Sequence, residues 1–246
     1  MPEYRNARII LNEEISSGIY KIVVEAQAGD KVKPGQFFML KCWDAEPVLW
    51  RPISISEVDE GSVTFLCAKT GRGTEKLVSL KSGQEIQLLG PLGNGFDTEK
   101  LGGRIALVCG GIGIAPMVEL SKRLSGFKPD LYAGFRNEGY AVDEIKKYAG
   151  NIYISTEDGS TGHKGYVTEI FDASDYDAVL CCGPEVMMEK VLRHCREKGK
   201  KVYVSMEKHM ACGVGACLVC TCRTKDGNRR TCKDGPVFDG DELVLD

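Results

Sequence analysis

The chain lacks long apolar runs, internal repeats and any cluster of histidines. No stretch of its 246 residues approaches the roughly 18–20 apolar residues that a membrane-spanning helix needs. The first residues, MPEYRNARIILNEE, place charges on both sides of a short apolar run, unlike a signal peptide. We therefore expect a cytoplasmic protein with no membrane partner. The three histidines, His163, His194 and His209, have no metal-ligand spacing, so we do not expect a histidine metal centre.

A strong charge of one sign is also missing. The formal net charge is −3, with 32 basic and 35 acidic side chains. Because binding to nucleic acid or to an anionic membrane surface usually needs a basic excess, neither is predicted as a partner. The content of 43% hydrophobic and 27% charged residues is ordinary for a globular protein with a packed core.

Cysteine, by contrast, is abundant. An intracellular chain seldom uses cysteines for disulfides, so eleven of them call for another explanation. A buried cysteine acts as a small hydrophobe, which suits six that are scattered through apolar or mixed segments: Cys42, Cys67, Cys109, Cys181, Cys182 and Cys195. Five others crowd together near the end and indicate a metal or redox role: Cys212, Cys217, Cys220, Cys222 and Cys232.

The pattern up to residue 98 is typical of a β domain. Short β-rich runs, such as 18–25, 36–41 and 62–69, alternate with turns rich in proline and glycine. Strands of this length and spacing favour an antiparallel barrel or sandwich.

Residues 99–206 predict a doubly wound parallel α/β domain. They begin with the apolar run 104–109 and a helical stretch at 116–124, and strand-like and helix-like segments then alternate, with one helix expected at 165–172. A last strand at 201–205 is expected to close this sheet. Residues 207–246 are rich in glycine and cysteine and too few to fold around a core of their own without a metal.

The cysteine-rich segment has the spacing of an iron–sulfur loop. Cys212, Cys217 and Cys220 form C-x4-C-x2-C, and Cys232 adds a fourth thiolate. Four thiolates are the ligand set of a [2Fe–2S] cluster, and the x4/x2 spacing is that of plant-type ferredoxins. A structural zinc site is the alternative, although zinc ribbons usually contain two C-x2-C pairs. Cys222 is a fifth cysteine that could replace Cys220.

Two turns in the α/β region indicate a dinucleotide site. Gly110, Gly111 and Gly113, followed by Pro116, lie between a buried strand and a helix, where free backbone N–H groups can hold a pyrophosphate. A second turn, Cys182-Gly183-Pro184, follows a later strand. Both turns stand at strand carboxyl ends, the edge at which open α/β sheets bind ligands. Tight packing is the alternative explanation for these glycines.

An ordered set of short strings in the first region resembles the flavin domain of the ferredoxin–NADP reductase superfamily. The set comprises Pro34-Gly35-Gln36-Phe37, Arg51-Pro52-Ile53-Ser54, Gly73-Thr74 and Gly90-Pro91-Leu92-Gly93. The resemblance implies that Arg51 pairs with the FAD pyrophosphate, with Pro52 and Ile53 beside it, and that the Ser54 hydroxyl lies near flavin N5. It also places Cys182 near the centre of hydride transfer. The second flavin segment would be Leu66-Cys67-Ala68, where the superfamily usually has an aromatic residue.

Taken over nearly its whole length, the chain resembles the electron-transfer subunits of dihydroorotate dehydrogenase B. The strings MACGVGACLVC and RPISIS are the most specific pieces. The resemblance implies a heterotetramer with an FMN-containing catalytic subunit, and electron flow from dihydroorotate through the [2Fe–2S] cluster and FAD to NAD⁺ in pyrimidine biosynthesis. Two alternatives stay open: a subunit of another complex, such as an NADH-dependent ferredoxin:NADP⁺ oxidoreductase, and a zinc-containing nucleotide sensor.

Overall fold

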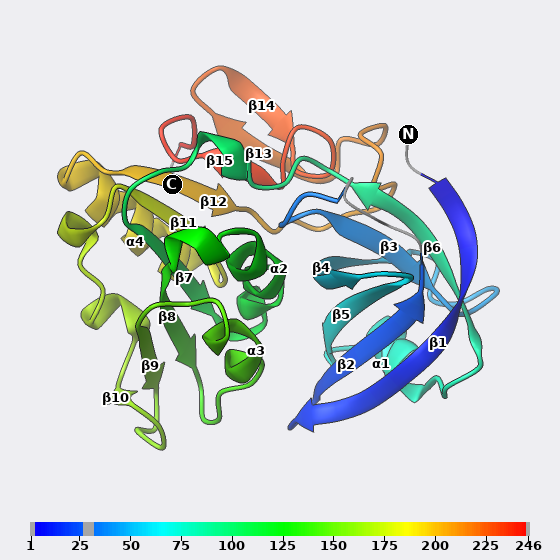
Figure 1. The fold of residues 1–246 in the computed structure, drawn as a ribbon. Helices are drawn as coiled ribbons and strands as arrows, with labels where there is room; N and C mark the ends of the chain where they lie inside the picture. Colours follow the sequence, from blue (N-terminus) through cyan, green and yellow to red (C-terminus); the bar gives the residue numbers. More distant parts are fainter. Residues whose placement is uncertain (1–2, 27–31, 245–246) are drawn as a thin grey trace.

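The computed structural model describes residues 3–26 and 32–244, which form a barrel, an α/β sheet domain and a tail that lies against both (Figure 1). Among these described residues, no helix is long and apolar enough to span a membrane.

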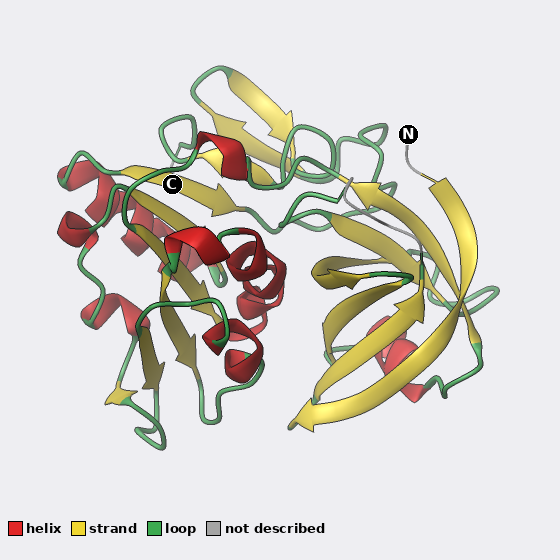
Figure 2. Cartoon of the chain, in the orientation of Figure 1, coloured by secondary structure: helices red, strands yellow, loops and turns green. Residues whose placement is uncertain are grey.

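The first part is the predicted antiparallel barrel. Alternation of buried and exposed residues along its strands turns one face inward, and the strands close in the order β1-β2-β5-β4-β3-β6. The elements are β1 (Glu3–Ser16), β2 (Ile19–Glu25), β3 (Phe37–Lys41), β4 (Arg51–Asp59), β5 (Ser62–Ala68), α1 (Arg72–Ser79) and β6 (Glu85–Leu92). Helix α1, visible beside the barrel in Figure 2, was not predicted.

The second part is the predicted parallel sheet. Its elements are β7 (Ile105–Gly110), α2 (Ala115–Arg123), β8 (Asp130–Phe135), α3 (Val142–Lys146), β9 (Ile152–Thr156), β10 (His163–Lys164), β11 (Ala178–Cys182), α4 (Glu185–Glu197) and β12 (Lys201–Ser205). Both faces of β7 and β11 are buried, which explains their continuous apolar sequences. The helix expected at 165–172 was wrong: only the 3₁₀ turn Val167–Glu169 forms there.

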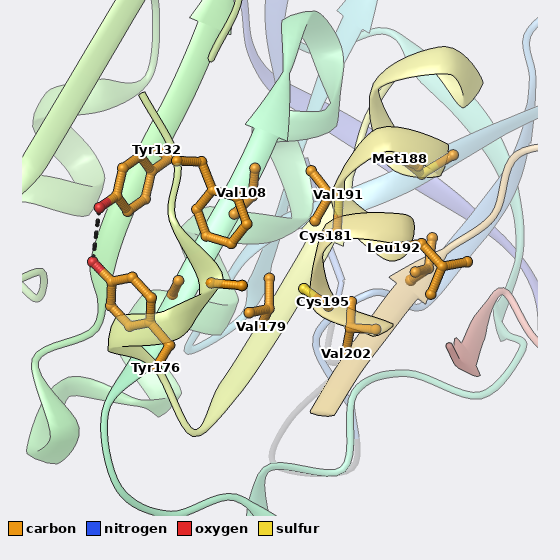
Figure 3. Packing of buried hydrophobic residues seen from close by; sticks show 14 of the residues in the cluster. Val108, Tyr132, Tyr176, Val179, Cys181, Met188, Val191, Leu192, Cys195 and Val202 are labelled. Atoms are coloured by element: carbon orange, nitrogen blue, oxygen red, sulfur yellow. Dashed lines mark hydrogen bonds between the residues drawn. The ribbon is translucent and has the colours of Figure 1, made fainter. Parts of the chain in front are cut away.

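One face of this sheet packs on α4 and on a group of aromatic side chains (Figure 3). The hydroxyls of Tyr132 and Tyr176 lie 2.9 Å apart, and Tyr176 donates to the buried carboxylate of Asp130. Asp130 also accepts hydrogen bonds from Asn151. This network ties together the amino-terminal edge of the sheet, opposite the edge that carries the glycine turns.

The tail does not fold apart from the rest. It forms the hairpin β13 (Thr221–Thr224) and β14 (Gly227–Arg230), and then β15 (Val237–Asp239). Strand β15 pairs antiparallel with β12, so that β12 is not the edge of the sheet, whose order among the described residues is β10-β9-β8-β7-β11-β12-β15. The tail therefore adds a strand to the sheet of the α/β domain (Figure 1).

A buried carboxylate joins the barrel to the sheet domain. Glu119 of α2 is completely buried, accepts a hydrogen bond from the Val58 backbone N–H at 3.0 Å, and forms an ion pair with Arg123 at 2.7 Å. Next to it, Lys122 donates to the Val58 carbonyl at 2.9 Å and to Asp59 at 2.7 Å. Helix α2 is thereby fixed to the end of β4.

We predict that Glu119→Ala destabilises the protein by about 2–3 kcal/mol, because it leaves the Val58 N–H without its charged acceptor. Unfolding in urea, followed by circular dichroism, measures this loss. Glu99→Ala is the matched control: Glu99 is exposed, and its loss is expected to change stability by less than about 0.5 kcal/mol. Equal stability of the two variants would contradict a joining role for Glu119.

Candidate functional site

The arginine of the R-P-x-S string lies over the first turn of α1. A Cβ added to Gly73 would come within 2.6 Å of the Arg51 guanidinium carbon, so a larger residue there would displace the arginine from its place over the helix. The Thr74 hydroxyl accepts hydrogen bonds from the Thr70 and Gly71 N–H groups and donates to the Gly71 carbonyl. Thr74 thus shapes the loop, and a guanidinium and a helix amino terminus converge as an anion such as a pyrophosphate requires.

Ser54 lies three residues further along β4, opposite Phe37 of β3. Its neighbours Pro52 and Ile53 are half-buried, as it is itself. This strand pair faces the tail on one side and the barrel core on the other.

The second flavin segment, in β5, divides between two cores. The Cys67 side chain is buried inside the barrel, and burial raises its pKa to about 12. Leu66 packs instead with the sheet domain, and Ala68 lines a cavity between the parts. Since its thiol faces inward, Cys67 can offer a flavin only its backbone.

The two predicted nucleotide turns touch each other. A Cβ on Gly113 would collide with the Cys182 carbonyl, and one on Gly183 would lie 2.8 Å from the Gly110 nitrogen. Gly111 has φ +53°, a conformation that glycine adopts easily. A 3₁₀ turn, Gly111–Ile114, leads into α2, which has Pro116 in its first turn.

These turns form one wall of a cavity of about 950 Å³ at the carboxyl edge of the sheet. Gly110, Gly111, Gly183 and Pro184 line it, and Ala68 reaches it from the barrel. The size suits a dinucleotide segment. The position agrees with the rule that open α/β sheets bind ligands outside their strand carboxyl ends.

A buried hydroxyl supports the fit of a nucleotide. Ser155, at the end of β9, is completely buried, lines the cavity, and its Oγ has no hydrogen-bond partner in the structure. Buried polar atoms are normally paired, so this oxygen is suited to a ligand hydroxyl or phosphate. Glu157 and Tyr166 line the cavity nearby. None of these three residues was predicted from the sequence, although the same strand-end rule could have pointed to Ser155.

Cys182 itself is buried beside this cavity. Burial raises the pKa of its thiol well above the ordinary value, the nearby Glu207 carboxylate raises it further, and a hydrogen bond with Ser205 opposes them. The thiol therefore stays neutral. Glu207 lines the cavity, and its side chain is exposed to solvent. The protein atoms around the carboxyl nevertheless desolvate it in part, which raises its pKa. Cys181 points to the opposite face of the sheet, as expected of a core residue.

The four predicted cluster ligands lie in two pairs. Cys212 and Cys217 are within hydrogen-bonding contact of each other, and so are Cys220 and Cys232. The first pair lies near the surface and the second is buried. Among the described residues, no three histidine, cysteine, aspartate or glutamate side chains converge as ligands of one metal ion. Two pairs suit two irons, each held by two thiolates, better than they suit one zinc ion.

Backbone N–H groups point at these sulfurs. Gly215 donates to Cys232 Sγ at 3.1 Å, and Ala216 donates to Cys212 Sγ at 3.3 Å. Gly213 and Gly215 have φ +72° and +83°, which allows this curl of the loop. Burial opposes ionisation of Cys212, but backbone donors outweigh it and lower its pKa to about 6. Such donors stabilise the negative charge of an iron–sulfur cluster.

The fifth cysteine points elsewhere. Cys222 belongs to the buried core of the sheet domain, whereas Cys220 and Cys232 pack with Phe37, Met39 and Leu92 on the outside of the barrel. Burial raises the pKa of the Cys222 thiol. The packing thus supports Cys220 over Cys222 as the ligand.

We predict that Cys220→Ser loses most of the bound iron and acid-labile sulfide, because a ligand of the buried pair is removed, while Cys222→Ala keeps both. Iron and sulfide analysis of the two purified variants measures this. If Cys222→Ala lost the cluster and Cys220→Ser kept it, the assignment of ligands would be reversed.

Comparison with known proteins agrees with this geometry. The model of the iron-sulfur cluster binding domain of dihydroorotate dehydrogenase B matches residues 207–244. The electron transfer subunit of dihydroorotate dehydrogenase B (NAD(+)) from Clostridium acetobutylicum is 53% identical over 243 residues, covering 99% of this chain and 98% of the relative. Its counterpart from Clostridium perfringens is 54% identical over 245 residues, covering 98% of both chains.

Solved structures share the fold. An NADH-dependent reduced ferredoxin-NADP oxidoreductase superposes with a TM-score of 0.86 at 28% identity, covering 97% of this chain and 89% of that one. A ferredoxin NADP⁺ reductase from Neisseria gonorrhoeae, with bound FAD and NADP, superposes with a TM-score of 0.65 at 14% identity, covering 85% and 95%. The greater identity to the curated relatives, over nearly the full length, decides between these families. The chain belongs to the electron-transfer subunits of NAD(+)-linked dihydroorotate dehydrogenase B.

Proposed function

We propose that the residues described above form a single route for electrons from a catalytic dihydroorotate dehydrogenase subunit to NAD⁺. The chain is an NAD-linked oxidoreductase subunit of pyrimidine biosynthesis, with FAD, a [2Fe–2S] cluster and NAD(H) as cofactors. The observation that carries the residue assignment is the paired arrangement of four cysteines, of which Cys220 and Cys232 pack against β3 and β6. We also propose functional boundaries near residues 98 and 206.

Electron counting sets the order of the cofactors. NAD⁺ accepts two electrons as a hydride, an iron–sulfur cluster passes one electron at a time, and FAD connects the two kinds of chemistry. In our proposal Arg51 and the first turn of α1 hold the FAD pyrophosphate, with the Ser54 hydroxyl beside the reactive flavin nitrogen. Backbone groups at Gly73 and along 66–68 complete the flavin site.

The nucleotide occupies the 950 Å³ cavity in this proposal. Gly110 and Gly111, which line the cavity, allow the chain to approach the pyrophosphate closely. Gly113 lets the turn at Cys182 pack against them, and Pro116 starts the helix that faces the pyrophosphate. Cys182, Gly183 and Pro184 lie beside the nicotinamide. The buried, neutral Cys182 thiol excludes water there and does not act as a nucleophile.

The surface around the outer thiolate pair suits a protein partner. Val214, Leu218 and Val219 are 44%, 63% and 54% exposed, next to the exposed Cys217. Leu218 has φ +61°, a strained conformation for a leucine, and strain of this kind is concentrated at functional sites. We propose that the FMN-containing catalytic subunit docks here, in a heterotetramer of two copies of each chain. Eleven free cysteines are consistent with the reducing cytoplasm.

Reconstitution with the catalytic subunit tests the whole proposal. The purified complex should bind FAD and iron with acid-labile sulfide, and it should reduce NAD⁺ when dihydroorotate is added. The catalytic subunit alone should not reduce NAD⁺. A complex that contains both cofactors and reduces NAD⁺ only with reduced ferredoxin would assign the chain to the ferredoxin:NADP⁺ type instead.

We predict that Glu157→Arg shifts the preference from NADH toward NADPH. The carboxylate at the end of β9 suits the ribose hydroxyls of NAD(H) and repels a 2′-phosphate, whereas an arginine attracts one. Steady-state kcat/KM with each nucleotide should show a relative gain for NADPH of roughly 10-fold, about 1.4 kcal/mol. Glu138→Arg is the control from the same cavity wall. Equal gains in both variants would point to general charge attraction rather than to recognition by Glu157.

A further inference from the structure

One aromatic side chain, Phe37 of β3, lies between the cysteine-rich tail and β4, the strand that carries Ser54. Strand β3 alternates: Phe38 and Leu40 point into the barrel core, while Phe37 and Met39 point outward under the tail. Phe37 is only 3% exposed and packs in one buried cluster with Cys220 and Cys232. Phe37 is therefore part of the apolar layer against which the buried cysteine pair packs.

Phe37 also faces the flavin strand. It is the direct register partner of Ser54 in the antiparallel pair of β3 and β4. Directly opposed residues project their side chains on the same face, with Cβ atoms about 4.5–5.5 Å apart. Phe37 is thus the one residue of β3 that both opposes Ser54 and belongs to the buried cluster of Cys220 and Cys232.

The surrounding chain holds this arrangement in place. Gly93 packs so closely on the Phe37 ring that an added Cβ would lie 3.1 Å from its Cε1 atom. Asn94 donates to the Lys233 and Asp234 carbonyls, and Gln36 donates to the Gly93 carbonyl at 2.7 Å. The strings before β3 and at the end of β6 therefore clamp the Cys232 side of the tail against Phe37.

We propose that Phe37 is the bridging residue for electron transfer between the [2Fe–2S] cluster and FAD. The inference rests on the proposed function, in which Ser54 adjoins the flavin. Each passage moves one electron: one iron is oxidised as the flavin gains an electron, or the reverse, and no bond or proton changes at Phe37. The ring fills the gap with packed atoms and excludes water, so the two centres couple through a short, dry contact.

The test uses the full chain in complex with its catalytic subunit, loaded with FAD and cluster. Rapid mixing with NADH separates two phases, flavin reduction by hydride and then cluster reduction, each followed by its own absorbance. For Phe37→Ala we expect the second phase to slow by roughly 10-fold or more, as is usual when residues around a metal site are lost. The first phase serves as the internal reference, and a bridging role predicts that the second phase slows more than the first. Phe37→Leu, which keeps an apolar side chain, should slow the second phase less.

Phe38→Leu is the matched control. Phe38 is adjacent, equally buried and packed edge-on against Phe65 in the barrel core. It should lower thermal stability without slowing the second phase. The cluster EPR signal and reduction potential, measured by titration, are the further readouts: a bridging role predicts a slower second phase that the change in potential does not account for.

An unchanged second phase in Phe37→Ala, or a slowing explained entirely by a shifted potential, would overturn the bridge and leave the proposed function standing. Failure of the proposed function looks different, because the wild-type complex would then lack flavin or iron, or show no NADH-dependent phase at all.

Discussion

The distance between β4, which carries Arg51 and Ser54, and the glycine turn before α2 depends on the junction of these two elements. Each element carries its site residues near its beginning: Arg51 and Ser54 open β4, and the glycine turn leads into α2. Their later residues are locked together through the buried Glu119 and the Val58 N–H. A buried carboxylate is costly unless every bond is made, so it tolerates few alternative dockings. Hydride transfer needs such a fixed approach, since small misplacements of reacting groups slow a reaction strongly.

The tail supplies a second constraint, and it binds to both parts at once. Strand β15 pairs with β12 of the sheet domain, while Cys220 and Cys232 pack against the outside of the barrel. A segment that is too short to form its own core is thereby stabilised by packing on the cores of both other parts. In our proposal this same short segment would fix the one-electron centre relative to β4 and to the cavity.

Much of the fold and of the cysteine site was predictable from the sequence, because hydrophobic periodicity and motif spacing are properties of short segments. The buried runs of β7 and β11 indicated parallel strands, and the spacing C-x4-C-x2-C by itself indicated the iron–sulfur loop. The failures have equally local causes. The segment 165–172 has helical spacing, but only one 3₁₀ turn forms there, and Val167 and Phe171 are buried against the face of the sheet. Helix α1 was hidden because Gly71 and Gly73, of which Gly73 lies against Arg51, are typical of a turn rather than of a helix. Ser155 was missed because its place at a strand end was the one signal in the sequence, and its burial without a partner is visible only in the structure. The domain boundaries and residue roles stay predictions.

The two cysteine pairs differ in exposure, since Cys212 and Cys217 lie near the surface while Cys220 and Cys232 are buried. Cys217 is exposed among apolar side chains, so in our proposal Cys212 and Cys217 would hold the side of a cluster that a docked partner could reach. Cys220 and Cys232 are buried in one cluster with Phe37, so they would hold the side that lies toward β3. Backbone donors are found at both pairs, to Cys212 and to Cys232, so the chain would stabilise negative charge on the sulfurs at both sides of a bound cluster. In our proposal a cluster held this way would connect an exposed face with a buried one, as a relay requires.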